Sequence, residues 1–219
     1  MAIKKYHLVL CFAIIFTLAV TMVVVSAPGV AAAPEETAVG NDEVVETSVS
    51  EPEESGTIFN GNGNNLDISK LRTGDVIVTK SWLGYFMPGG WSHSLIYYGY
   101  GWCIEANQNG VVWCRASAVR DADAAAIYRV RTSSSIKSAA RYFAARQLGK
   151  PYDFRWLTYI GGKQVYGSSY YCSELCWAAY KAYGVDIDRY TGWSWKYGYN
   201  VAPRELCDDR DTYQVAYSS

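Results

Sequence analysis

The chain contains 219 residues with a formal net charge of −1; 50% of the residues are hydrophobic, 15% aromatic and 19% charged. This composition excludes a chain that is disordered throughout and a multi-span membrane protein. Only two histidines are present, His7 and His93, which excludes a multi-histidine metal site. The net charge predicts little about binding partners, because the charges are unevenly distributed along the chain.

The first 33 residues have the pattern of an export signal. Lys4 and Lys5 precede a predominantly apolar run of 18 residues, Leu8 to Val25, and small residues follow as far as Ala33. We expect cleavage after Ala32. The run is also just long enough to span a bilayer, so a retained N-terminal anchor is the alternative. Either outcome predicts a secreted or cell-envelope protein.

An acidic segment follows, and it separates the signal from the folded domain. Residues 34–69 contain nine acidic residues and no Lys or Arg. Such a stretch buries too little apolar surface to offset its ordering entropy, so we expect a disordered linker or propeptide over residues 34–65 and one folded domain over residues 66–219. From Lys70 onward, 18 Lys and Arg stand against 12 Asp and Glu, a balance of +6. That charge favours anionic surfaces such as cell wall or membrane, or serves solubility alone.

Short β-branched and aromatic runs predict an antiparallel sheet. The expected strands cover residues 75–79, 94–99, 102–106, 111–116 and 127–131, and the middle three form a meander because turn-rich residues separate them. We expect one helix after a cap at Ser133 or Ser134, ending before Gly149, and a second from Cys172 to Tyr183. The remainder is expected to be aromatic loop. The predicted fold class is α+β.

His93 is the only histidine of the predicted domain and lies at the start of a strand. If that strand folds back around Gly99–Gly101, His93 falls opposite position 105, 106 or 107. Glu105 shares the sequence parity of His93, so both side chains should leave the same face of the sheet, with Asn107 as the second choice. A carboxylate or amide facing an imidazole orients a catalytic base and fixes its tautomer. The alternatives are a structural histidine bound to a backbone carbonyl and an ordinary surface glutamate.

Cys172 lies at the expected N-terminus of the second helix. There the helix dipole and unpaired backbone N–H groups favour a thiolate, the form that a cysteine nucleophile requires. The same N–H groups can stabilise an oxyanion on an attacked carbonyl. A buried structural cysteine is the alternative, and Cys176, between Leu175 and Trp177, fits that alternative better.

The cysteines also allow two other arrangements. Cys103 and Cys114 flank the turn at residues 107–110 symmetrically, so a cross-strand disulfide is geometrically feasible in an exported protein. A zinc site built from Cys172, Cys176 and His93 is disfavoured, because the Cys-x-x-x-Cys spacing is loose and no Cys-x-x-Cys pair exists. We therefore predict no metal and no other cofactor.

Five short segments occur in the order found in one known family. They are Leu71–Ile77, Ser92–Ser94, Ile104–Ala106, Gly149–Asp153 and Tyr171–Leu175. Together they resemble the circularly permuted branch of the NlpC-type papain-like hydrolases, the YiiX-like group, over about residues 70–188. The resemblance implies a permuted papain-like fold, a small antiparallel sheet or half-barrel packed against two or three helices, in which the histidine precedes the cysteine.

The resemblance also implies roles for individual residues. It makes Cys172 the nucleophile, His93 the base and Glu105 the residue that orients the base, and it assigns Tyr171 to the oxyanion site. Ser94 departs from the pattern, because many relatives have a small residue such as Gly after the histidine.

These assignments predict an exported cysteine hydrolase that cleaves amide or isopeptide bonds through a thioester acyl-enzyme. The favoured substrate is cell-wall peptide, with peripheral wall or membrane association and no nucleic acid. A lipid acyl hydrolase or acyltransferase with the same triad is one alternative, and a non-catalytic cell-wall-binding module is another. Several aromatic residues are candidates to line a substrate cleft or to form core: Trp82, Tyr85, Phe86, Trp91, Trp193 and Trp195.

Overall fold

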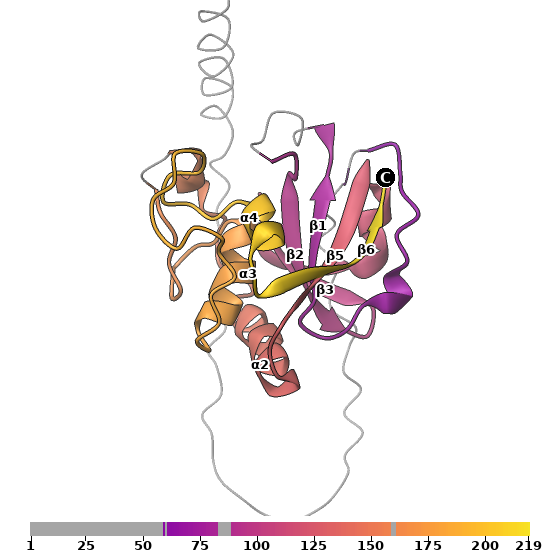
Figure 1. The fold of residues 1–219 in the computed structure, drawn as a ribbon, viewed down its shortest axis with the longest axis horizontal. Coiled ribbons are helices and arrows are strands. Elements are labelled where there is room, and N and C mark those ends of the chain that lie inside the picture. Colours follow the sequence, from indigo (N-terminus) through magenta and orange to yellow (C-terminus); the bar gives the residue numbers. More distant parts are fainter. Residues whose placement is uncertain (1–58, 60, 83–88, 159–160) are drawn as a thin grey trace, which may run out of the picture. The chain divides into compact units, whose positions relative to one another are not determined.

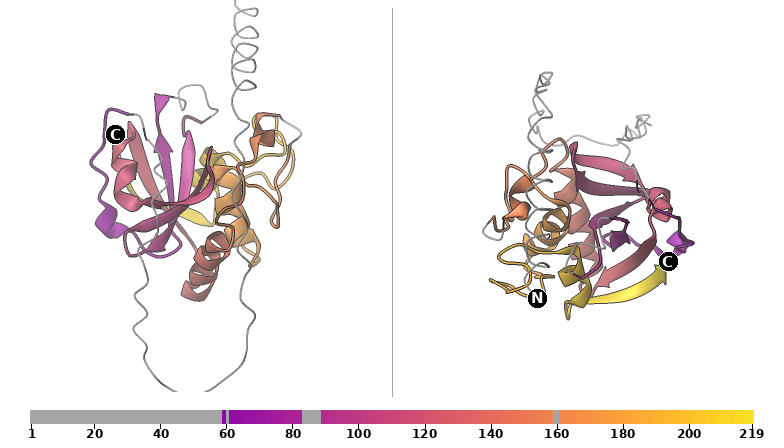
Figure 2. Two further views of the ribbon diagram at one scale, coloured as in Figure 1. Left: turned by 180° about the vertical axis from the view of Figure 1, so that it is seen from behind. Right: turned by 90° about the horizontal axis from the view of Figure 1, so that it is seen from above.

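The structure is a computed structural model that describes residues 59, 61–82, 89–158 and 161–219. The predicted signal, nearly all of the predicted linker, and the candidate cleft residues Tyr85 and Phe86 lie outside the described residues. In the described part of the chain, six antiparallel strands form one curved sheet, and the α-helices gather on one side of it (Figures 1 and 2). The α+β fold class predicted from the sequence is confirmed.

The strand order in the sheet is β4-β3-β2-β1-β5-β6. The strands are Val76–Lys80 (β1), His93–Gly99 (β2), Trp102–Asn107 (β3), Gly110–Arg115 (β4), Ala124–Val130 (β5) and Thr212–Ser218 (β6). The first five confirm the predicted runs to within a few residues, and β2, β3 and β4 form the expected meander. The expectation of a loop at the C-terminus is wrong, because β6 pairs with β5 along its whole length.

Three α-helices lie in the described residues: α2 (Ser134–Ala145), α3 (Cys172–Lys181) and α4 (Pro203–Asp208). The hydroxyl of Ser133 accepts a hydrogen bond from the N–H of Ile136, which confirms one of the two expected caps of α2. The helix α4 was expected to be loop. It forms because Pro203 stands at its start and the Glu205 carboxylate accepts the N–H of Ala202. Three short 3-10 helices complete the set: Ile68–Lys70, Ala116–Asp121 and Phe154–Leu157.

Hydrophobic cores form on both faces of the sheet. The larger core lies under α2 and α3 and includes Val78, Ile96, Phe143 and Leu175. The second core includes Ile77 and Leu95, and residues that precede β1 cover it: Phe59, Leu66 and, in part, Ile68 and Leu71. Within the described residues, packing onto the domain therefore includes Phe59, which precedes residue 66. No helix of the described residues is long and apolar enough to cross a membrane.

A buried ion pair fixes the start of β1 to β5. The guanidinium of Arg129 donates to both carboxylate oxygens of Asp75, at 2.8 and 2.7 Å, and also to the carbonyl of Lys70. Both side chains are nearly inaccessible to solvent. Because β1 lies between β2 and β5, this pair helps to hold the middle of the sheet, next to the strand that carries His93.

Candidate active site

Three elements bring the predicted triad residues together. His93 is the first residue of β2, Glu105 lies in the adjacent strand β3, and Cys172 is the first residue of α3, which packs against both strands. The Nε2 atom of His93 lies 2.7 Å from Oε2 of Glu105. The prediction that these two side chains leave the same face of the sheet is confirmed.

Glu105 is the fully buried member of this group. Its Oε2 atom contacts His93, and its Oε1 atom accepts a hydrogen bond of 2.9 Å from the side-chain amide of Asn107. Asn107, the second choice for orienting the base, thus holds the carboxylate instead. A buried carboxylate with both oxygens bound in this way fixes the orientation of the imidazole and stabilises its positive charge.

Cys172 and His93 lie close enough for each to shift the pKa of the other. With Nε2 bound to Glu105, Nδ1 is the ring nitrogen that remains for the Cys172 thiol. Burial alone would lower the pKa of His93, but the neighbouring Cys172 and Glu105 raise it well above its ordinary value. Burial likewise opposes ionisation of Cys172, yet the His93 charge and hydrogen bonds from His93, Ser94 and Ser173 lower the pKa of the thiol. Both shifts favour a thiolate–imidazolium pair.

The N-terminus of α3 is anchored by the two side chains that follow Cys172. The hydroxyl of Ser173 donates to the carbonyl of Val201, at 2.7 Å. The carboxylate of Glu174 accepts the N–H groups of Tyr171 and Gln164, and burial raises the pKa of Glu174 to about 7. These contacts hold the first turn of the helix, so the thiol and the backbone N–H groups at the helix start keep a fixed direction.

Tyr171 and Cys176 both lie in the core. The hydroxyl of Tyr171 accepts the N–H of Val201 at 2.9 Å, and burial raises the pKa of this phenol well above its ordinary value. The contact shows Tyr171 as an anchor of the segment at residue 201, and its role in an oxyanion site stays a prediction. Cys176 is fully buried, and burial raises the pKa of its thiol, as expected for a structural cysteine.

Comparisons with known proteins identify the family of the chain. Residues 70–216 match the family of permuted papain-like amidase enzymes named YaeF/YiiX, C92. The chain belongs to this family. It is therefore a papain-like cysteine hydrolase of amide bonds, and the resemblance seen in the sequence is confirmed at that level.

One solved structure shows the same fold. It is the metalloprotein yiiX from Escherichia coli O157:H7, 20% identical to this amidase, with a TM-score of 0.51 over 67% of this chain and 97% of that chain. At this identity the likeness concerns the fold alone. No curated protein sequence matches the chain.

The E. coli protein is named a metalloprotein, which raises the question of a metal centre in this amidase. In the part of the chain that the structure describes, no group of three or more His, Cys, Asp and Glu is placed to hold a metal ion. Cys172, His93 and Glu105 carry donor atoms of the kinds that bind metals, but the described residues do not place them as such a group. These residues do not fit a metal centre, and no metal is given a role in the mechanism below.

Tyr152 lies near the site, and the sequence reasoning assigns it no role. It is paired with Tyr170 in an isolated bridge just before α3. Burial, and then the charge of Cys172, raise the pKa of its hydroxyl well above the ordinary value. The hydroxyl therefore keeps its proton. One sequence signal could have identified Tyr152. It lies in Gly149–Asp153, one of the five segments that carry the family resemblance.

The other cysteine pair lies in the pairing of β3 with β4. Cys103 faces Cys114 directly in the pairing of β3 with β4, which confirms the symmetric placement expected from the sequence. Both side chains are fully buried, and the structure contains no disulfide between them. The predicted cross-strand disulfide thus has the right register but is not formed here.

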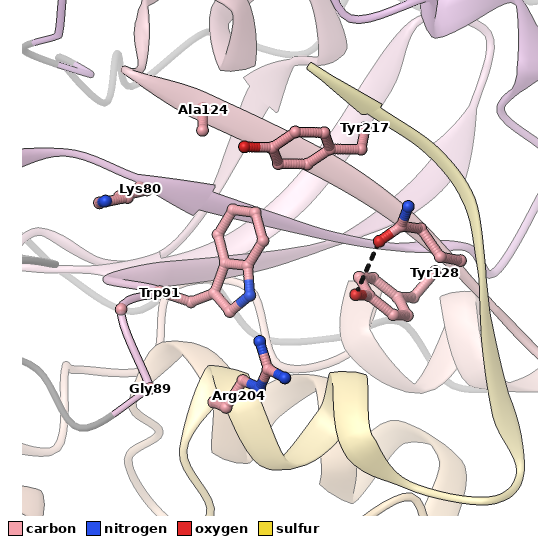
Figure 3. Close-up of a pocket in the computed structure, with 9 residues that line it drawn as sticks. Lys80, Gly89, Trp91, Ala124, Tyr128, Arg204 and Tyr217 are labelled. Atoms are coloured by element: carbon pink, nitrogen blue, oxygen red, sulfur yellow. Dashed lines mark hydrogen bonds between the residues drawn. The ribbon is translucent and has the colours of Figure 1, made fainter. Parts of the chain in front are cut away.

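A pocket of about 380 Å³ opens beside the end of β1 and the start of β2 (Figure 3). Lys80 and Trp91 line it; Lys80 follows Thr79, the residue that faces His93 in the β1–β2 pairing, and Trp91 precedes His93 by two residues. The guanidinium of Arg204 points toward the indole of Trp91 (Figure 3). The remaining walls come from β5, β6 and two glycines: Ala124, Tyr128, Gln214, Tyr217, Gly89 and Gly90.

Proposed function

We propose that this amidase hydrolyses amide or isopeptide bonds of cell-wall peptide outside the cytoplasm, with Cys172, His93 and Glu105 as its catalytic triad. The observation that carries the proposal is the 2.7 Å contact of Glu105 with His93, beside Cys172 at the start of α3, where His93 and Cys172 shift each other's pKa toward the ionised pair. A base that is bound on one side by a buried carboxylate and on the other by a thiol is the arrangement that activates a cysteine nucleophile.

The reaction follows from this contact in two steps. The Cys172 thiolate attacks the amide carbonyl, and N–H groups at the start of α3 stabilise the tetrahedral oxyanion. The His93 imidazolium gives its proton to the leaving amine, so the C–N bond breaks and a thioester forms. His93, now neutral, takes a proton from water. The resulting hydroxide equivalent attacks the thioester, which releases the acid and restores the thiolate and the imidazolium.

Three features support cell-wall peptide as the substrate. The N-terminal run predicts export, and the domain from Lys70 onward carries a balance of +6. The pocket near the start of β2 is lined by two cationic side chains, Lys80 and Arg204, of which Arg204 is paired with Asp208, and by no Asp or Glu of the described residues. Peptides of bacterial walls carry free carboxylates, which the positive balance of the domain favours.

The test is to incubate the full chain separately with purified wall digest and with phospholipid, and to identify the products by mass spectrometry. The proposal predicts new amine termini on wall peptides, lost in Cys172→Ala and in His93→Ala. Cys207→Ala, which changes a cysteine outside the site, is the matched control and keeps full activity. Released fatty acid with no new amine would select the lipid acyl alternative, and full biological activity of Cys172→Ser would leave a non-catalytic binding module.

A further inference from the structure

The segment from Arg189 to Tyr199 presents a group of aromatic side chains to solvent. Tyr190, Trp193, Trp195 and Tyr199 are all exposed, and 90% of the surface of Trp195 is accessible. Isolated exposed apolar residues are normal, but several large ones in one short segment mark an interaction site. We call these four residues, together with Arg189 and Lys196, the tryptophan surface.

An ordered turn holds the two tryptophans. Ser194 and Gly198 exchange two backbone hydrogen bonds of 2.8 Å, and the Ser194 hydroxyl accepts the N–H of Tyr197. The side chain of Tyr197 is buried and fixes the turn to the domain. Trp193 and Trp195 meet edge to face, with ring centroids 4.5 Å apart and planes at 76°. The sequence left open whether these two rings form core or line a cleft. The structure exposes both to solvent in a defined arrangement.

The charge of the tryptophan surface is positive. The segment from Arg189 to Tyr199 contains Arg189 and Lys196 and no Asp or Glu. Both basic side chains are exposed, and neither forms an ion pair with a carboxylate of the described residues. The acidic residues just before the segment are each bound to a lysine, in the pairs Asp186–Lys181 and Asp188–Lys163. The two side chains lie over the rings of Tyr190 and Tyr197, and their positive charges face solvent without a carboxylate in an ion pair among the described residues.

We propose that the tryptophan surface docks onto an anionic lipid bilayer. Trp and Tyr are the residues that settle at the level of the headgroups, where the ring is buried and its polar edge stays hydrated. Lys and Arg beside them gain attraction from anionic lipids. Glycan is the competing partner, since aromatic rings also stack on sugars. The observations favour lipid, because rings at 76° give no common flat platform and the segment offers no carboxylate to sugar hydroxyls.

The tryptophan surface adjoins the active site. Val201, two residues after Tyr199, is hydrogen-bonded to both Tyr171 and Ser173, the neighbours of Cys172. The side-chain amide of Asn200 donates to carbonyls in the loop at residues 156–158, so the two loops lie side by side (Figure 1). Docking would hold the helix start that carries Cys172 close to the membrane. The inference goes beyond the proposed hydrolysis and does not depend on the substrate.

Tryptophan emission gives a direct test, because the first 58 residues contain no Trp and so do not contribute. The full chain carrying Cys172→Ala, which removes catalysis from the measurement, is mixed with vesicles of phosphatidylglycerol and phosphatidylcholine whose acyl chains are brominated. We expect a blue shift and quenching by bromine. Both are reduced in vesicles of phosphatidylcholine alone, and both are reduced by Arg189→Gln with Lys196→Gln.

The double variant Trp193→Ser with Trp195→Ser should lose this quenching. Tyr100→Ser is the matched control. It removes an exposed aromatic ring just after β2, at the end of that strand opposite to His93, and should leave the quenching unchanged. Circular dichroism checks that each variant is folded. Quenching that persists unchanged in the double variant would overturn the proposal, and so would binding to insoluble wall glycan with no quenching in any vesicle.

Discussion

Replacing Glu105 with glutamine removes one charge from the site and keeps the shape of the side chain. Both carboxylate oxygens accept hydrogen bonds, one from His93 and one from Asn107. In glutamine one of these oxygens becomes an NH2 group, which faces one of the two donors and cannot accept its hydrogen bond. A hydrogen bond between charged groups is worth about 1.5–3 kcal/mol. At about 1.4 kcal/mol per factor of ten, Glu105→Gln should lower kcat/KM by roughly 10- to 150-fold.

The same change, Glu105→Gln, should shift the pKa values of both His93 and Cys172. Without the carboxylate, the pKa of His93 falls toward its ordinary value, and the pKa of Cys172 rises because less positive charge faces the thiol. The rate at which iodoacetamide alkylates Cys172, followed by peptide mapping at a series of pH values, reports this without any substrate. We expect the acid limb of the alkylation profile to move to higher pH.

Glu205→Gln is the matched control for this experiment. Glu205 is also a buried carboxylate, but it accepts the N–H of Ala202 at the start of α4 and has no contact with His93. Its replacement should leave the alkylation profile of Cys172 in place. Folded Glu105→Gln protein with the wild-type profile and the wild-type kcat/KM would exclude an orienting role for Glu105.

The same contacts lead to three further predictions. The pH–rate profile of hydrolysis should be bell-shaped, with an acid limb below the ordinary cysteine pKa and an alkaline limb near the His93 pKa of about 10. Arg129→Leu leaves Asp75 buried and unpaired, so urea unfolding should show a loss of about 3–5 kcal/mol, whereas Arg210→Leu at an exposed position should show none. Burial raises the pKa of Glu205 to about 7, so the folded state holds a proton that the unfolded state releases, and unfolding free energy should fall as pH rises from about 4.5 to about 7. Glu205→Gln should lose that part of the slope, and an unchanged slope would contradict the assignment.

Local sequence patterns predict the meander of β2, β3 and β4 and the contact of His93 with Glu105. The turns at residues 99–101 and 107–110 separate β2, β3 and β4, and the parity of His93 and Glu105 predicts their contact. The strand β6 could not be predicted in this way, because Tyr213 and Gln214 are exposed and its stability comes from pairing with β5. The helix α4 had a signal in Pro203 and Glu205, a proline followed by an acidic residue in the first turn.

The approach of Cys172 to His93 lies beyond local reasoning. The two residues are far apart in the sequence and belong to a helix and a strand whose packing depends on the whole sheet order. At the level of sequence, only the resemblance to a known family joins them. In the same way, local patterns gave no reason for Asn107 to bind Glu105 instead of His93, since residues 105 and 107 share a face and compete for one position.

The proposed mechanism requires a covalent intermediate on Cys172. The full chain is mixed with wall digest, quenched in acid at short times and mapped by mass spectrometry. We expect an acyl adduct on Cys172 that hydroxylamine removes, as a thioester requires, and that is absent in Cys172→Ala. Release of the same products by Cys172→Ala at the wild-type rate, or an adduct on another residue, would contradict the mechanism.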